Sequence, residues 1–92
     1  MEAVTLGQIL SHASGVELKG TTYETAAGHR LSFYIGAGDQ AMVLSGIVKV
    51  ELHQGFVRLE RKPGDGTLYF ELSVVHGVAI RPPDDATKAG FS

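Results

Sequence analysis

Residues 42–80 decide the fold, and their sequence is MVLSGIVKVELHQGFVRLERKPGDGTLYFELSVVHGVAI. Within this stretch apolar and polar residues alternate, as in Val48, Val50 and Leu52, which are separated by polar side chains. Side chains two residues apart in a β-strand lie on the same face, so this alternation is typical of a strand with one buried face. Two glycine-containing turn sequences divide the stretch, which therefore predicts three antiparallel strands in series.

The first turn is predicted at Gln54-Gly55, because two-residue hairpin turns need positive φ angles, which glycine adopts readily. Folding the chain there sets apolar residues opposite one another on one face and opposite charges on the other. The predicted pairs are Leu52–Val57 and Val50–Leu59 on the inner face, and Glu51–Arg58 and Lys49–Glu60 on the outer face.

The second turn is predicted at residues 63–66, Pro-Gly-Asp-Gly, where proline presets φ and glycine permits the bend. Both hairpins then combine apolar pairing inside with polar pairing outside, which gives the meander a defined register. The pairs predicted from the second turn are Leu59–Phe70, Val57–Leu72, Arg58–Glu71 and Glu60–Tyr69.

The composition is that of one small globular domain. The chain has 92 residues, of which 43% are hydrophobic and 20% are charged. We expect a single domain over residues 1–83 and a polar, frayed tail over residues 84–92. Cysteine is absent, which excludes disulfides and thiolate metal ligands and favours a cytoplasmic protein. The first ten residues do not match a signal peptide, and no stretch has the roughly 18 apolar residues of a membrane span.

Outside residues 42–80 the sequence predicts a short helix and several strands. Residues 5–8, Thr-Leu-Gly-Gln, have the form of a capping box with Thr5 as N-cap, so we expect a helix over about residues 5–13. The further predictions are one bent strand or two short ones over residues 16–25, a turn over 26–29, a strand over 31–35 with Leu31, Phe33 and Ile35 inward, a flexible loop over 36–40, and a last short strand over 78–80 that Pro82-Pro83 ends.

A short helix followed by about five strongly bent strands predicts an all-β fold, a small barrel of five or six strands with the helix as a lid. Over residues 46–80 the chain resembles the two sequence motifs of the Sm, LSm and Hfq family of RNA-binding ring proteins. Residues 75–80, VHGVAI, resemble the second motif. The resemblance implies an Sm- or SH3-like barrel. The glycine and apolar places of the first motif are held at matching spacing by Gly46, Val48, Val57 and Leu59.

The polar recognition groups of that family are not matched. Where the family has the Asp and Asn of a turn that grips a base, this chain has Leu52 and Phe56. It has His76 where eukaryotic and archaeal members have arginine. The formal net charge of −2 also differs from the basic surplus of most proteins that bind phosphate. The resemblance therefore implies the barrel more than it implies an RNA site.

The sequence contains no pattern of a catalytic or metal centre. A nucleophile elbow and paired carboxylates at suggestive spacing are missing, and the glycine-rich residues 36–40 lack the Lys-Ser/Thr of a phosphate-binding loop. We therefore expect a non-enzymatic protein without cofactor or metal. The four histidines have no metal-pair spacing and are His12, His29, His53 and His76.

Binding functions of two kinds remain, and RNA or single-stranded nucleic acid is the leading ligand class because of the family resemblance. Stacking of bases on aromatic or imidazole planes is a suitable chemistry for such a site. The candidate residues for a nucleic-acid site are His76, Gln54, Arg58 and Tyr69.

The alternative is a protein-interaction or assembly module that does not bind nucleic acid. Such a module would present an exposed apolar surface, for which Phe56 and Tyr34 are the candidates. Both hypotheses predict self-association as a homo-oligomer or ring. Pro82-Pro83 closes the last strand and leaves a neighbouring strand edge free for another subunit.

Overall fold

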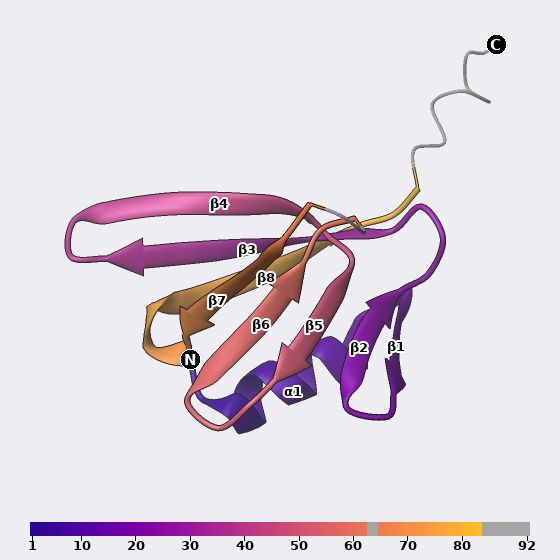
Figure 1. Ribbon diagram of the computed structural model, residues 1–92, viewed down its shortest axis with the longest axis horizontal. Helices are drawn as coiled ribbons and strands as arrows, with labels where there is room; N and C mark the ends of the chain where they lie inside the picture. Colours follow the sequence, from indigo (N-terminus) through magenta and orange to yellow (C-terminus); the bar gives the residue numbers. More distant parts are fainter. Residues whose placement is uncertain (63–64, 84–92) are drawn as a thin grey trace, which may run out of the picture.

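The computed structural model describes residues 1–62 and 65–83, which form one α-helix, one 3₁₀ helix and eight strands (Figure 1). The chain is mostly β with a short N-terminal helix, as predicted, but it has more strands than the five or six expected. The elements are α1 (Ala3–His12), β1 (Val16–Lys19), β2 (Thr22–Thr25), β3 (Arg30–Ala37), β4 (Gln40–Ile47), β5 (Lys49–Leu52), β6 (Phe56–Glu60), β7 (Thr67–Glu71), η1 (Leu72–Val74) and β8 (Val75–Arg81).

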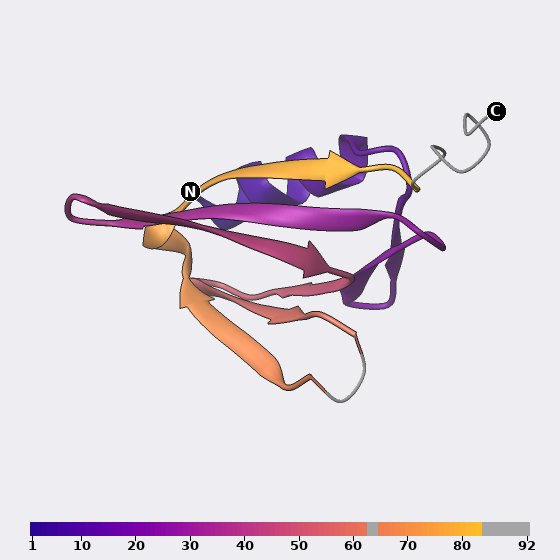
Figure 2. The same ribbon diagram turned by 90° about the horizontal axis from the view of Figure 1, so that it is seen from above.

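The strands form two antiparallel sheets, with the orders β1-β2-β5-β6-β7 and β4-β3-β8. The chain passes from one sheet to the other at Val48, between β4 and β5 (Figure 2). Gly46 has a φ of +78° just before this crossing, a backbone conformation that glycine adopts without a steric penalty. The Val48 N–H donates to the Glu60 carbonyl oxygen at 2.8 Å, and the Val48 carbonyl oxygen accepts from the Thr25 N–H at 3.0 Å. These two hydrogen bonds hold the chain at Val48 to β6 on one side and to β2 on the other.

The hairpin of β5 and β6 has the predicted register. Gly55 in its turn has a φ of +93°, and the His53 N–H donates to the Phe56 carbonyl oxygen at 3.0 Å, which closes the two-residue turn. Val50 and Leu59 are fully buried, as the alternation predicted. The observed pairs are Lys49–Glu60, Val50–Leu59, Glu51–Arg58 and Leu52–Val57.

The hairpin of β6 and β7 is shifted by two residues from the predicted register, so that prediction was wrong. The Asp65 N–H donates to the Lys62 carbonyl oxygen at 3.1 Å, and the chain therefore reverses one residue earlier than the predicted turn. A shift of two residues leaves each side chain on its predicted face, so alternation alone does not distinguish the two registers. Pro63 and Gly64 of the predicted turn lie outside the described residues. The observed pairs are Phe56–Glu71, Val57–Phe70, Arg58–Tyr69, Leu59–Leu68 and Glu60–Thr67.

Residues 16–25 form two short strands, β1 and β2, which pair as an antiparallel hairpin. Of the two predicted alternatives, one bent strand or two short strands, the structure therefore has the two short strands. The predicted turn over residues 26–29 is present, with the His29 N–H donating to the Ala26 carbonyl oxygen at 2.9 Å.

The predicted flexible loop over residues 36–40 was wrong, because these residues belong to a long hairpin. β3 continues to Ala37, and β4 begins at Gln40. Gly38, with a φ of +64°, permits the two-residue turn between them. The hairpin of β3 and β4 extends beyond the rest of the molecule (Figure 1).

α1 begins two residues before the predicted N-cap, so the capping-box prediction was wrong. Thr5 is already helical, and the N-cap is Glu2, whose carbonyl oxygen accepts from the Leu6 N–H at 3.0 Å without a side-chain cap. The nitrogen of Met1 donates to the carbonyl oxygens of Leu72 in η1 and of Val75 at the start of β8, at 2.7 and 3.1 Å. Met1 also packs against the core, and these contacts fix the first turn of the helix.

β8 covers Val75–Arg81 and is longer than the strand predicted over residues 78–80. The 3₁₀ turn η1 and a bulge in the pairing of β8 with β3 account for the irregular pattern of residues 73–77. The strand ends directly before Pro82-Pro83, as predicted. The prediction of a frayed tail concerns residues 84–92, which lie outside the described part of the chain.

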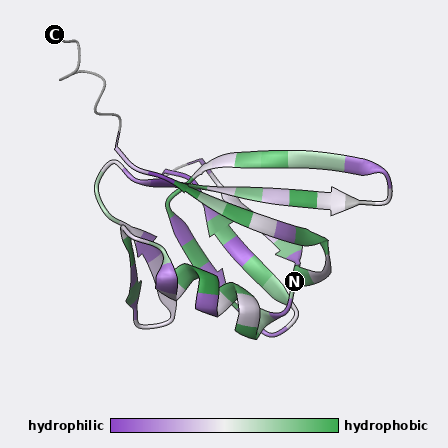
Figure 3. Ribbon diagram, turned by 180° about the vertical axis from the view of Figure 1, so that it is seen from behind, coloured by the Kyte–Doolittle hydropathy of each residue, from purple (hydrophilic) through white to green (hydrophobic). Residues whose placement is uncertain are grey.

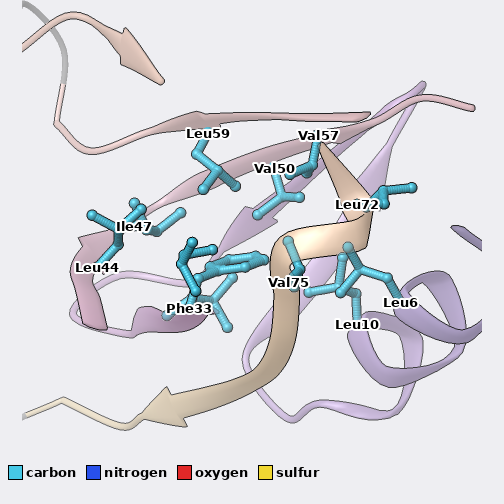
Figure 4. Close-up of a cluster of buried hydrophobic side chains, with 12 residues drawn as sticks. Leu6, Leu10, Phe33, Leu44, Ile47, Val50, Val57, Leu59, Leu72 and Val75 are labelled. Carbon is cyan, nitrogen blue, oxygen red and sulfur yellow. The ribbon is translucent and has the colours of Figure 1, made fainter. Parts of the chain in front are cut away.

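One hydrophobic core lies between the two sheets and α1 (Figure 4). Phe33 of β3 is the largest fully buried side chain, and the predicted inward orientation of Leu31, Phe33 and Ile35 is confirmed. No polar or charged side chain is buried within residues 1–62 and 65–83. The core residues are Leu6, Leu10, Leu31, Phe33, Ile35, Leu44, Ile47, Val50, Val57, Leu59, Leu72 and Val75.

Alanine is expected to change the stability in opposite directions at two glycines. In α1 a Cβ on Gly7 would meet Leu52 and Tyr23 at an ordinary contact distance of 3.5 Å. Gly7→Ala is therefore expected to raise the free energy of unfolding by about 0.5 to 1 kcal/mol, because alanine favours a helix. Gly46→Ala is expected to lower it by about 1 to 2 kcal/mol, because a side chain strains this left-handed backbone. Urea denaturation measures both changes, and a shift of the same sign in both variants would contradict these conformations.

Candidate binding face

β5, β6 and β7, together with His53 directly after β5, present nine side chains on one outer face of their sheet. Alternate residues of these strands point away from the core, and the observed registers align them in three rows. We call this set of nine the outer face. Its rows are Lys49–Glu60–Thr67, Glu51–Arg58–Tyr69 and His53–Phe56–Glu71.

Three aromatic rings lie side by side at one end of the outer face. The rings of His53 and Phe56 are stacked, with centroids 4.5 Å apart and planes inclined by 10°. The Phe56 and Tyr69 centroids are 6.3 Å apart, with planes inclined by 44°. Phe56 is 39% exposed and Tyr69 is 61% exposed, so both rings remain accessible. The two-residue shift of β7 creates this cluster, because it sets Tyr69 opposite Arg58 and beside Phe56.

Arg58 and His53 are engaged by carboxylates of the same face. Arg58 lies 3.2 Å from Glu60 and 4.0 Å from Glu51, and His53 Nε2 lies 2.9 Å from a Glu51 oxygen. The pKa of Arg58 is raised above its usual value, chiefly by side-chain hydrogen bonding with Tyr69. Partial desolvation opposes this change, and the two carboxylates add to it. Arg58 is therefore a permanent cation whose charge its neighbours already balance.

Glu71 differs from the other carboxylates of the outer face. It is exposed and lies opposite Phe56. Within the described residues its one polar side-chain contact is with the Ser73 hydroxyl, which donates to it at 3.3 Å. The outer face has three carboxylates against the two cations Lys49 and Arg58, which leaves one surplus negative charge near the aromatic rings.

The residues predicted for a nucleic-acid site are divided between the two sheets. Arg58 and Tyr69 are cross-strand neighbours, and Gln54 lies exposed in the adjoining turn. His76 belongs to β8 in the other sheet, where its ring nitrogen Nε2 is 3.3 Å from the Gly36 carbonyl oxygen.

The residues predicted for a protein-interaction surface also lie on different sheets. Phe56 is on the outer face, whereas Tyr34 is 44% exposed on β3. Tyr34 lies opposite Val43 of β4, which is 53% exposed, and the next residue along β4, Met42, is 54% exposed. Sequence reasoning missed β4 as part of a surface, because the continuous apolar run of residues 41–44, Ala-Met-Val-Leu, is typical of a buried strand.

A groove of about 390 Å³ lies between α1 and the strands β3 and β8. Its lining is mainly apolar and includes Ile9, Leu31, Val78 and Ile80. The sequence did not indicate this groove, because the apolar face of the helix and the alternating residues of β8 have the pattern of ordinary core positions.

The described residues give no metal site and no membrane-spanning helix. No group of three or more His, Cys, Asp or Glu side chains is placed to hold a metal ion within residues 1–62 and 65–83. In the same part of the chain, no helix has both the length and the hydropathy needed to cross a membrane.

Comparison with family models, with curated proteins and with solved structures gives no match for this chain. The resemblance of residues 46–80 to the Sm motifs therefore stays a prediction.

Proposed function

We propose that this chain is a non-enzymatic binding module whose outer face contacts a cationic segment of another protein. The observation that carries the proposal is the exposed pair of Phe56 and Tyr69 beside Glu71, a carboxylate with no cation bound to it in the described residues. Aromatic rings attract arginine and lysine through their negative faces, and an adjacent carboxylate adds a charge-assisted hydrogen bond.

The fold that we propose for the module is an Sm- or SH3-like barrel. Three features support it. The chain bends sharply from β4 into β5, β3 pairs with both β4 and β8, and the 3₁₀ turn η1 joins β7 to β8. We further propose that the module self-associates, because in the described part of the chain four strands lie at sheet edges with one side unpaired.

RNA or single-stranded nucleic acid is the second candidate ligand. The stacked His53 and Phe56 rings and the exposed Tyr69 ring favour it, because bases stack on such planes. The charge of the outer face opposes it, since Arg58 is balanced by carboxylates and one negative charge is in surplus. Affinity for phosphate comes mainly from lysine and arginine side chains that are not already paired with carboxylates of the protein.

Substitution of Glu71 by glutamine is expected to affect the two ligand classes in opposite ways. Fluorescence anisotropy would be measured with a labelled arginine–serine peptide, a glutamine–serine peptide of equal length, and an oligouridine. For the arginine–serine peptide we expect Glu71→Gln to weaken binding about five- to tenfold, because one cation–carboxylate contact is lost. Any oligouridine binding should instead become stronger, because a repelling charge is removed.

The matched control is Glu17→Gln, which removes one exposed carboxylate from β1 at the far edge of the same sheet. It changes the net charge equally and should leave binding of the arginine–serine peptide unchanged. Equal binding of both peptides by the native protein would overturn the proposal. Binding of oligouridine alone would support the second candidate.

A further inference from the structure

β4 is an edge strand with an unusual composition. It lies at one end of the order β4-β3-β8, and within residues 1–62 and 65–83 it pairs with β3 alone (Figure 1). Its eight residues, Gln40–Ile47, include neither a charged residue nor a proline. Figure 3 shows its hydrophobic residues along the outer margin of the molecule.

Natural edge strands usually carry charges or proline, which prevent their free backbone groups from pairing with another chain. The other three edge strands of the described residues follow this rule. β1 contains Glu17 and Lys19, β7 ends with Glu71, and β8 ends with Arg81 before two prolines. β4 alone lacks such protection, although it is the longest of the four.

The side chains of β4 are exposed on both faces of the hairpin. Val43 lies opposite Tyr34 on one face, and Met42 lies opposite Ile35 on the other. More than half of the surface of Val43 and of Met42 is accessible. A strand added along β4 would therefore gain backbone hydrogen bonds together with apolar contacts on both faces.

We propose that β4 pairs antiparallel with β4 of a second copy of this chain, which joins the two three-stranded sheets into one. The charge pattern favours a copy as the partner. An uncharged strand meets its own copy without placing like charges opposite each other. In β1, by contrast, pairing with a second copy would join strands of only four residues, half the length of β4.

A two-fold axis through the strand pair makes the interface isologous, so it closes with two copies and leaves the outer face of each copy free. Residues that pair across two strands share a face of the sheet. Val43 would then lie near Val43 of the second copy on one face, and Met42 near Met42 or Leu44 on the other. This interface is on a different sheet from the outer face, so it does not depend on the proposed ligand.

Val43→Lys is expected to convert the dimer into a monomer, because it sets two like charges close together at the middle of the strand pair. Analytical ultracentrifugation over a range of protein concentrations would measure the mass of the native protein and of this variant. The matched control is Leu18→Lys, since Leu18 is 56% exposed on β1, another edge strand. This variant should remain a dimer.

Hydrogen exchange of the β4 amides in the native protein is an independent measurement that needs no variant. These amides should exchange more slowly at concentrations where the dimer forms than at concentrations where it dissociates. A native protein that is monomeric throughout, or a dimer that survives Val43→Lys with β4 exchange unchanged, would overturn the proposal.

Discussion

Replacement of Phe33 by alanine is expected to lower the free energy of unfolding by about 3 to 5 kcal/mol. Phe33 is fully buried, and its ring lies among residues from both sheets (Figure 4). Its removal leaves a cavity that the surrounding strands, fixed by their hydrogen-bonded registers, fill only in part. A domain of this size has little stability to lose, so the melting temperature should fall by about 12 °C or more.

The matched control is Tyr34→Ala, which removes a ring from the next residue of the same strand. Tyr34 is 44% exposed, so its truncation should cost less than about 1 kcal/mol. Thermal and urea denaturation followed by circular dichroism measure both variants. Similar losses at the two positions would mean that the inner and outer faces of β3 are assigned wrongly.

Simultaneous replacement of Phe56 and Tyr69 by serine is expected to weaken binding of the arginine–serine peptide by about 30-fold. The two rings each contribute about 1 kcal/mol to the binding of a cation, and this sum corresponds to that ratio of dissociation constants. Both rings are partly exposed on the outer face, so the fold should survive their removal.

Tyr34→Ser is the matched control for binding, because it removes an exposed ring from the other sheet. Its affinity for the peptide should equal that of the native protein. Circular dichroism of the double variant establishes that the sheets are intact. Retention of full affinity in a folded double variant would show that the aromatic rings do not contact the peptide.

The sequence predicted a hairpin correctly where two independent signals agreed. In β5 and β6, the Gln54-Gly55 turn and the alternation of residues 49–60 indicate the same register. In β6 and β7 the turn sequence allowed more than one point of reversal, and a shift of two residues preserves both faces. The alternation therefore specified the faces but not the partners, and Tyr69 was paired with Glu60 instead of Arg58.

Contacts between residues far apart in the sequence explain the other differences between the predicted and the observed elements. Directly before α1, the Met1 nitrogen bonds to Leu72 of η1 and to Val75 of β8, and a local capping pattern does not reveal such contacts. The length of β8 depends on a bulge opposite Tyr34 and Ile35, because the extra residue breaks the alternation of its sequence. A prediction from local patterns fails at such places because tertiary packing decides them.

The candidate site was predictable in part. Alternation placed Arg58 and Tyr69 outward, and both lie on the outer face with Phe56, which was predicted to be exposed. The position of Glu71 beside the aromatic rings was not predictable, because it follows from the shifted register that sets this residue opposite Phe56. His76 lies apart from the other residues predicted for a nucleic-acid site because it belongs to the second sheet. The order of the strands in the sequence does not reveal this placement.

The most direct test of the proposed function is a ¹⁵N–¹H correlation spectrum of the labelled protein, recorded while the arginine–serine peptide is added. Saturable shifts should be largest for His53, Phe56, Tyr69 and Glu71 and absent when the glutamine–serine peptide is used. Shifts centred on the groove between α1 and β8, or equal shifts with both peptides, would contradict the assignment of the outer face as the binding surface.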